Sequence, residues 1–340
     1  MVTLKEIAAQ CGCSVATVSK ALNKMPDISA KTARRICDMA MEMGYLPNAA
    51  ARTLKTSRSR TIGLLLFLRG ESVWTHDYFA KIAASIQTVM GESGYDITPI
   101  NCDGASVMGS YLDYCRYRSY DGIIVMSAGF TEKYLLELID SEIPLVTIDY
   151  AFHHRGAVLS DNVQGMRDLV RYVHAKGHRR IAFIHGEDTS VTRNRLASFY
   201  TTAEELNVSV PDEYVCPAFY HDPDSSARAT RRLLELPQRP TCILYPDDYS
   251  YVGGMNELLN RGMRIPEDIS VAGYDGIRLA EILRPRLTTL RQDSEGIGRH
   301  AARMLLKAIE KPRSFISQHV TLPGRIMEGE TVGSIDGDAR

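Results

Sequence analysis

The sequence predicts an α/β protein, with an N-terminal all-helical head followed by a two-lobed core of parallel sheets. From Thr61 onward, short apolar strands alternate with amphipathic helices, which is typical of parallel sheets covered by helices on both faces. The first 45 residues carry no strand pattern. Residues 61–340 are too many for one doubly wound sheet, so we expect two such lobes.

Residues that favour the start of a helix divide the head into three short helices. Thr3 followed by Glu6 matches a capping box, in which each side chain satisfies a backbone amide at the start of a helix. Ser14 and Ser29 can cap the second and third helices. Because the turn between the first two helices is only residues 11–13, we predict a helix-turn-helix.

A linker is expected between Tyr45 and Arg60. Asn48 can cap a short helix over residues 49–55, which is too short to be stable alone in water. Its apolar Leu54 stands beside basic side chains. Leu54 either packs on the head or enters the minor groove of DNA as a wedge that unstacks a base step.

The strands and helices of the core follow from local apolar patterns. The expected strands are Ile62–Phe67, Tyr95–Ile100, Gly122–Met126, Leu145–Ile148, Ile181–Ile184, Tyr214–Ala218, Cys242–Tyr245 and Ile269–Ala272. The helical stretches include Tyr78–Gly91, Thr131–Ser141, Val163–Ala175, Arg193–Leu206, Ser225–Leu236 and Tyr249–Asn260.

Charge is distributed unevenly along a chain whose formal net charge is −1. Residues 1–60 hold 10 Lys or Arg and 4 Asp or Glu, whereas the remainder holds 30 basic and 37 acidic residues. A basic head on an acidic core indicates that the head alone binds nucleic acid.

Several other classes are excluded by composition. The longest apolar run, Ile62–Leu68, is far short of the roughly 20 residues of a membrane helix, and the start lacks the apolar core of a signal peptide. We therefore expect a cytoplasmic protein. The 7 cysteines are scattered and odd in number, which argues against a disulfide framework. No His or fourth Cys accompanies Cys11, Cys13 and Cys37 at zinc-ligand spacing, so no metal site is expected.

Enzyme motifs are missing from the sequence. It contains no Gly-Lys of a P-loop, no G-x-S-x-G and no H-E-x-x-H. No glycine-rich fingerprint follows the first strand, so we expect neither catalysis nor a cofactor. Asp247-Asp248 could bind a metal, but we favour Asp247 as an acceptor for a ligand hydroxyl and Asp248 as the cap of the next helix.

The second helix of the head has the residues of a DNA-reading helix. In a helix-turn-helix its first residues face base edges in the major groove. Val15 and Ala16 suit thymine methyl groups, and Lys20 can donate to guanine or to phosphate. Val18 and Leu22 are expected in the core. Short hydroxyls suited to phosphates are those of Ser14, Thr17 and Ser19.

These residues carry a resemblance to a known family. Thr3 to Asn23, TLKEIAAQCGCSVATVSKALN, resembles the head of the LacI/GalR family of bacterial repressors. The similarity continues through ISAKTARRI, GYLPNAAARTLKTSRSRTIGLLL, YDGIIV, IPLVTID, DNVQGM, GHRRIAFIHG, RIPEDISVAGYDG and RPRLTTLRQD. It implies a homodimer with a core like that of periplasmic sugar-binding proteins. It also favours Leu54 as a minor-groove wedge on paired hinge helices that order on operator DNA.

The resemblance adds candidate binding residues. For DNA these are Thr3, Asn23, Ser29, Thr32, Asn48 and Lys55, beside those named above. For a small-molecule effector between the lobes, Asp149 and Asp275 match positions that bind sugar hydroxyls, and Arg195 matches an arginine that grips a hydroxyl pair or an acid. Further effector candidates are Tyr78, Phe79, Arg193, His221 (or Tyr220, if the alignment slips by one), Asp247 and Gln292.

The interpretation is a transcriptional repressor controlled by a small molecule, a sugar in our first hypothesis. The alternatives are a nucleoside, a purine or a phosphoprotein co-regulator in the same fold, or a sugar-binding or sugar-modifying protein. The expected divisions are a head over residues 1–46, a hinge over 47–60 and a core over 61–340. Within the core, one lobe takes residues 61–160 and 292–322, and the other takes 161–291 and 323–340.

Overall fold

The structure is a computed structural model that describes residues 2–22, 25, 27–45, 58–66, 76–100, 109–127, 130 and 132–335. It divides into two compact units, Met1–Ser59 and Arg60–Arg340. Each unit is described by itself.

The first unit is a three-helix head. Its helices are α1 (Leu4–Cys11), α2 (Val15–Leu22) and α3 (Ala30–Glu42). The capping box of Thr3 and Glu6 is formed at the start of α1, as the sequence predicts. Val18 is fully buried, while Leu22 is half-buried against the same core. The packing of α1 on α2 and α3 therefore confirms the helix-turn-helix core.

The second unit contains two sheets. The first has the strand order β11-β5-β4-β3-β1-β2, with every paired strand parallel. We call it, with its helices, the N-lobe. Its strands are β1 (Thr61–Leu66), β2 (Asp96–Pro99), β3 (Gly122–Ser127), β4 (Leu145–Ile148), β5 (Gly156–Ser160) and β11 (His319–Leu322). Its helices are α5 (Asp77–Glu92), α7 (Tyr111–Tyr117), α8 (Lys133–Ile139), α14 (Ser294–Glu310) and the 3-10 turn η3 (Pro312–Ser314).

The second sheet, with its helices, is the C-lobe. Its order is β12-β10-β9-β8-β6-β7, parallel except for the antiparallel β12. Its strands are β6 (Ile181–His185), β7 (Val215–Pro217), β8 (Cys242–Leu244), β9 (Ser270–Asp275), β10 (Thr288–Arg291) and β12 (Arg325–Met327). Its helices are α9 (Asn162–Ala175), α10 (Ser190–Glu205), α11 (Pro223–Leu234), α12 (Tyr251–Asn260), α13 (Arg278–Ile282) and the 3-10 turn η2 (Asp212–Tyr214).

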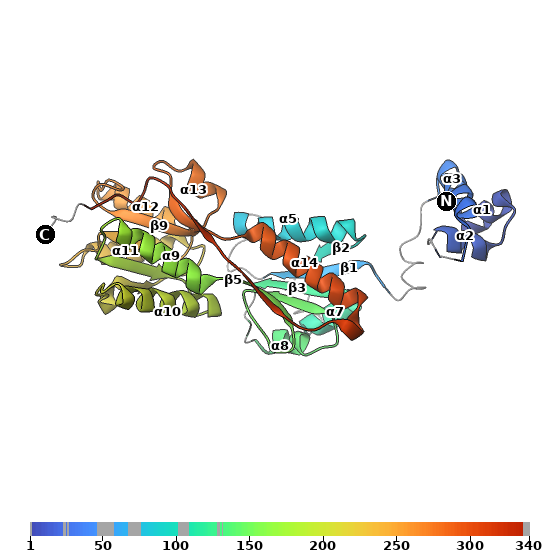
Figure 1. The fold of residues 1–340 in the computed structure, drawn as a ribbon, viewed down its shortest axis with the longest axis horizontal. Coiled ribbons are helices and arrows are strands. Elements are labelled where there is room, and N and C mark those ends of the chain that lie inside the picture. The colour runs from blue at the N-terminus through green and yellow to red at the C-terminus, as the bar shows by residue number, and fades with distance from the viewer. Residues whose placement is uncertain are drawn as a thin grey trace. The chain divides into compact units, whose positions relative to one another are not determined.

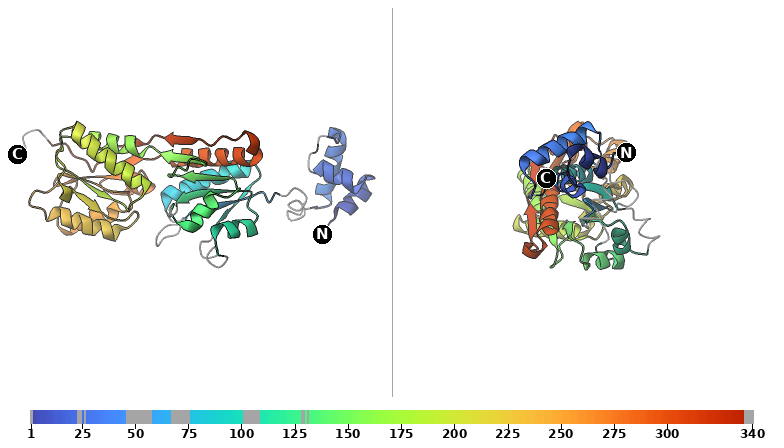
Figure 2. Two further views of the ribbon diagram at one scale, coloured as in Figure 1. Left: turned by 90° about the horizontal axis from the view of Figure 1, so that it is seen from below. Right: turned by 90° about the vertical axis from the view of Figure 1, so that its right-hand side faces the viewer.

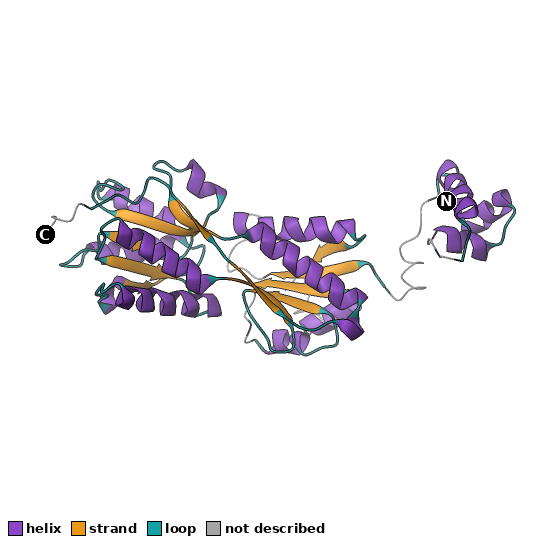
Figure 3. Cartoon of the chain, in the orientation of Figure 1, coloured by secondary structure: helices purple, strands orange, loops and turns teal. Residues whose placement is uncertain are grey.

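Helices cover both faces of each sheet (Figures 1 and 3). In the N-lobe, α5 and α14 share one apolar core, and α7 and α8 share the other. In the C-lobe, α9 and α10 pack on one face while α11, α12 and α13 pack on the opposite face. The predicted pair of parallel α/β lobes is confirmed.

The chain passes between the two sheets at residues 161, 292–293 and 323–324. Figure 2 shows the consequence, since the red C-terminal helix and strand complete the lobe built by the cyan and green segments. Strands β5, β10, β11 and β12 are absent from the sequence-based prediction. Within the described residues, no helix is long and apolar enough to cross a membrane.

Candidate DNA-binding surface and effector site

The start of α2 presents a small exposed surface. Val15 and Ala16 are exposed, with Val15 keeping 39% of its surface accessible. Ser14 accepts from the backbone amide of Thr17 at 3.1 Å, and the two hydroxyls lie 2.9 Å apart. The hydroxyls predicted for phosphates thus also form the cap that begins the helix.

Lys20 has a partner that the sequence analysis did not foresee. Its ammonium group forms an ion pair with Asp27, and both side chains stay about half exposed. The hydrogen bond from Lys20 lowers the pKa of the Asp27 carboxyl. A contact from Lys20 to DNA therefore competes with this ion pair.

The other candidate residues of the head serve as helix caps. Thr3 caps α1, and Ser29 caps α3 by accepting from the amide of Thr32 at 3.2 Å. Ser19 is half-buried on α2. The remaining DNA candidates, Asn23, Asn48, Leu54 and Lys55, lie outside the described residues.

In the core, the carboxyl ends of strands from both lobes carry the polar side chains of the candidate effector site. Asp149 follows β4, Asp247 lies beyond β8, and Asp275 ends β9. Gln292 follows β10, whose register pairs Arg291 with Asp275. Parallel sheets place these ends at one edge, so the topology gathers residues that are far apart in sequence.

Tyr78 joins the N-lobe to the segment between the lobes. Its hydroxyl lies 3.4 Å from Asp149 Oδ2 and 3.4 Å from Gln292 Oε1. Gln292 in turn donates its amide to Asp275 Oδ1 at 2.6 Å. The single proton of the Tyr78 hydroxyl is shared between Asp149 and Gln292, and this network of polar contacts links Asp149 of the N-lobe with Asp275 of the C-lobe.

Both carboxyls are held in constrained backbone conformations. Asp149 has φ of 60° and Asp275 has φ of 100°, a region that non-glycine residues rarely occupy. Asp149 accepts from the amide of Ser160 at 2.9 Å, and its carbonyl accepts from Ser190 of the C-lobe at 3.0 Å. Burial raises the pKa of Asp149, and it raises that of Asp275 to about 6.

Arg195 is a buried cation fixed on three sides. It is 3% exposed, donates from Nε to Asn162 at 2.8 Å, and donates from Nη1 to the Pro246 carbonyl at 2.8 Å. Its guanidinium lies 3.4 Å from the centre of the Tyr274 ring and 5.7 Å from that of Tyr220. A planar fork held in this way can bind a hydroxyl pair or an acidic group.

The helix cap predicted at Asp248 is formed by Asp247 instead. Asp247 accepts from the amide of Ser250 at 2.7 Å, so it caps the turn before α12. Asp248 is fully buried and accepts from Ile277 and Thr289 instead. The prediction that Asp248 is the helix cap was wrong, because its side chain points toward β9 and β10 rather than along its own chain.

His221 lies between the lobes. Its backbone amide donates to Asp247 at 3.0 Å, and its ring centre lies 3.8 Å from that of His76 in the N-lobe. Phe79 is also near, with ring centres 6.0 Å apart. The sequence analysis missed His76, although it directly precedes the predicted Tyr78–Phe79 segment.

Arg193 is not brought to these residues. It is exposed and forms a two-bond ion pair with Asp188, at 2.6 and 3.1 Å. Other polar residues that the analysis missed include Asn162, Ser190 and Thr192, whose hydroxyl lies 2.9 Å from that of Tyr220. They carry no motif, and only contacts between distant segments show their place.

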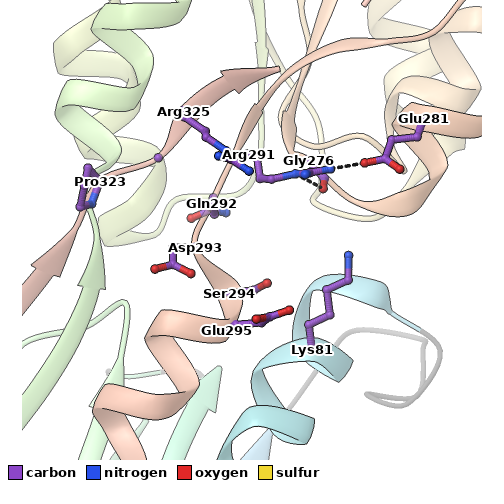
Figure 4. Close-up of a pocket in the computed structure, with 11 residues that line it drawn as sticks. Lys81, Gly276, Glu281, Arg291, Gln292, Asp293, Ser294, Glu295, Pro323 and Arg325 are labelled. Atoms are coloured by element: carbon purple, nitrogen blue, oxygen red, sulfur yellow. Dashed lines mark hydrogen bonds and ion pairs between the residues drawn. The ribbon is translucent and has the colours of Figure 1, made fainter. Parts of the chain in front are cut away.

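A polar cavity of about 650 Å³ lies beside the site, with Gln292 in its wall (Figure 4). Arg291 in this cavity donates to the Gly276 carbonyl and pairs with Glu281, while Lys81 pairs with Asp77 at 2.9 Å. The amide of Arg278 also donates to Asp77, at 2.8 Å, which joins α13 to α5. Among the described residues, no group of three or more His, Cys, Asp or Glu could hold a metal.

Comparison with known proteins identifies the family. Residues 3–48 match the model "Bacterial regulatory proteins, lacI family", and residues 170–332 match "Periplasmic binding protein-like domain". The chain is 31% identical to the probable HTH-type transcriptional repressor ExuR of Bacillus subtilis (strain 168), over 92% of this chain and 93% of that protein. The chain belongs to the LacI family. Members are transcriptional regulators and not enzymes, and this member is a DNA-binding repressor with an effector-binding core.

Other proteins are similar to this chain over nearly its whole length. The repressor PurR of Klebsiella pneumoniae (strain 342) is 30% identical over 98% of this chain and 97% of its own. The lac repressor dimer bound to operator and the anti-inducer ONPF has a TM-score of 0.82 at 23% identity, covering 98% of this chain and 99% of that one. A CelR–cellobiose complex has a TM-score of 0.74 at 24% identity, covering 97% and 100%. The two solved structures support the fold.

Proposed function

We propose that this LacI-family repressor acts as a homodimer whose affinity for operator DNA is set by a neutral carbohydrate bound where the two lobes meet. The observation that carries the proposal is the network of polar contacts from Asp149 through Tyr78 and Gln292 to Asp275. It places acceptors from both lobes at one point. Ligand hydroxyls are donors that such acceptors require.

The buried charges favour hydroxyl groups over a phosphate. Asp149 and Asp275 both interact with the buried guanidinium of Arg195, and Asp247 interacts with Asp275. A phosphate would meet this excess of carboxylates and be repelled. The aromatic rings of Tyr78, Phe79 and Tyr220 can cover the apolar face of a sugar.

Control of DNA binding follows from a population shift. A ligand that contacts residues of both lobes binds one lobe arrangement more tightly than the other, and so increases its population. The effector then changes the affinity for operator DNA, and operator DNA changes the affinity for the effector, by the same coupling free energy. The head reads bases through the start of α2, while Leu54 enters the minor groove as a wedge.

A nucleoside or purine is the second candidate for the effector. It is favoured by the rings of His76, Phe79 and His221, whose centres lie within 3.8 to 6.0 Å of one another. A flat base could stack on such rings.

Among the related proteins, one solved structure contains cellobiose and another contains ribose, which supports the carbohydrate hypothesis.

The test is a thermal-shift and calorimetry screen of the full chain. Its panel contains D-ribose, D-glucose, cellobiose, D-glucuronate, glucose 6-phosphate and adenosine. We expect a neutral sugar to raise the melting temperature and to change operator affinity. Binding by the phosphate ester alone, or by adenosine alone, would overturn the neutral-carbohydrate assignment.

A further inference from the structure

Two histidines from opposite lobes meet beside the effector site. His76 directly precedes α5 in the N-lobe, and His221 follows β7 in the C-lobe. Their ring centres lie 3.8 Å apart, and Phe79 lies 5.4 Å from His76. His76 is only 3% exposed. This contact is therefore one of the places where the lobes touch.

Three of the four ring nitrogens of this pair have no hydrogen bond among the described residues. Neither Nδ1 nor Nε2 of His76 has a hydrogen bond, and Nδ1 of His221 also has none. His221 Nδ1 lies 3.6 Å from Asp247 Oδ1, which is within ion-pair distance when the ring is protonated but too long for a hydrogen bond. Buried polar atoms without partners are rare because each costs desolvation free energy. Their presence at a lobe contact indicates a group that joins them.

The protonation of His76 limits the nature of that group. Burial, together with the neighbouring His221, lowers the pKa of His76 to about 4, against the opposing effect of Asp247 and Asp77. His76 is therefore neutral at pH 7, with one ring nitrogen that donates and one that accepts. A hydroxyl group both donates and accepts, whereas a carboxylate or phosphate only accepts.

The charges around His221 point to the same class of ligand. Burial alone would lower the pKa of His221, but Asp247, and to a smaller extent Asp275 and Glu187, outweigh burial and raise it. The carboxylate of Asp247 thus favours the protonated form of His221. An anionic ligand group at this position would be repelled by Asp247.

We propose that His76 and His221 form a polar subsite of the effector site that receives a neutral hydroxyl of the ligand, and that His76 is a specificity-determining residue. The proposal deepens the proposed function and rests on it for the place of the ligand. Lobe closure brings the two rings together, and the ligand hydroxyl takes the hydrogen bonds that the rings cannot make to each other.

The test combines His76 variants with deoxy ligands. His76→Phe keeps a ring against His221 and removes both nitrogens, and His76→Asn keeps a donor and an acceptor. His300→Phe, on the exposed face of α14, is the matched control. Calorimetry measures the dissociation constants of D-ribose, D-glucose, cellobiose and adenosine, and of the monodeoxy forms of whichever binds.

We expect the parent to lose about tenfold in affinity for one deoxy form, as for one lost hydrogen bond. His76→Phe should lose about tenfold for the complete ligand and nothing further for that deoxy form, and His76→Asn should recover part of the loss. Equal losses for the deoxy form in the parent and in His76→Phe would overturn the proposal, because the hydroxyl would then bind elsewhere.

A pH series separates ligand recognition from a structural role. The pKa of the buried His76 is about 4, so a form with parted lobes in which His76 has the ordinary histidine pKa of 6.5 would bind a proton as pH falls below 6.5. His76 should then contribute a loss of roughly 30-fold in affinity between pH 7.5 and 5, on top of any contribution from Asp275, and His76→Phe should lack the His76 contribution. A parent protein whose affinity does not depend on pH in this way would contradict the proposal.

The same measurements distinguish the two hypotheses. If only adenosine binds, the carbohydrate function fails, while its 2′-deoxy and 3′-deoxy forms still test the His76 subsite. If a sugar binds and His76→Phe behaves like the parent, the subsite fails and the carbohydrate function stands. If none of the probes binds, both are overturned.

Discussion

Gln292 donates its side-chain amide to Asp275 at 2.6 Å, and this bond ties the segment after β10 to the end of β9. Asp275 is 7% exposed, and burial raises the pKa of its carboxyl from 3.8 to about 6, against the opposing effect of Arg195. The folded protein therefore holds a proton on Asp275 more tightly than the unfolded chain does.

The first prediction is a pH-dependent gain in stability for Asp275→Asn. Between pH 3.8 and 6 the folded state binds more protons at this site, so the parent loses stability as pH rises through that window and then levels off. The full loss is about 3 kcal/mol at pH 7.5. The asparagine side chain cannot ionise, and its carbonyl oxygen can still accept the hydrogen bond from the Gln292 amide.

Urea unfolding at pH 4.5 and pH 7.5 measures this difference. We expect the free energy of unfolding of Asp275→Asn to exceed that of the parent by more at pH 7.5 than at pH 4.5. A gain of the same size at both values would contradict the assigned pKa.

The second prediction concerns the response to effector. Asp275→Asn and Arg195→Ala should abolish the change in operator affinity at effector concentrations that saturate the parent, because each leaves a polar edge of the ligand desolvated, at about 1–3 kcal/mol. Arg193→Ala should respond like the parent, since Arg193 is exposed and paired with Asp188. Fluorescence anisotropy with labelled operator, with and without the effector, measures all three.

Operator affinity without effector should change little in these variants, because they alter the core and leave the head intact. If Asp275→Asn and Arg195→Ala both respond normally, the candidate effector site is wrong. If only Arg193→Ala loses the effector response, then Arg193 and not Arg195 binds the effector.

The third prediction concerns the ion pair of Lys20 and Asp27. Lys20→Ala should weaken operator binding by roughly 1–3 kcal/mol and relax the preference at one symmetric base pair, if Lys20 donates to guanine. Asp27→Asn frees Lys20 from its partner and should tighten binding. Competition with a library of operator variants tests both, and a loss that is uniform across sequences would make Lys20 a phosphate contact.

The fourth prediction concerns Leu54. A wedge offsets the cost of unstacking a base step, a few kcal/mol, by bending the duplex and widening the contact. Leu54→Ala should weaken binding to an operator with a central CpG step while leaving the melting temperature of the free protein nearly unchanged. Equal losses on operator and random DNA, or a large fall in melting temperature, would favour packing of Leu54 on the head.

Local signals in the sequence determined the head and most of the lobes. The capping box of Thr3 and Glu6 and the cap at Ser29 depend on residues three apart, and β4 matches its predicted bounds, Leu145–Ile148. These features form within a few residues, so their pattern is visible without the fold. The absence of enzyme motifs is likewise visible in the sequence without the fold.

The strands β5, β10, β11 and β12 were decided by tertiary structure. They are short, and β11 joins the N-lobe sheet beside β5 although the two lie far apart in the chain. Strands β11 and β12 each form one edge of a sheet, and β5 and β10 are the interior strands beside them, so the place of all four depends on pairing with segments that are distant in the chain.

The chemistry of the site was divided in the same way. Sequence placed Asp149 and Asp275 at strand ends, and the family resemblance named Gln292 and favoured Arg195 over Arg193, but only the fold shows that Arg195 is on the buried face of α10. Asp247 and Asp248 are both buried, and only their partners distinguish them, since Asp247 accepts from Ser250 and Asp248 accepts from Ile277 and Thr289. His76 has no motif, and its meeting with His221 exists only because two lobes far apart in sequence bring their strand ends together.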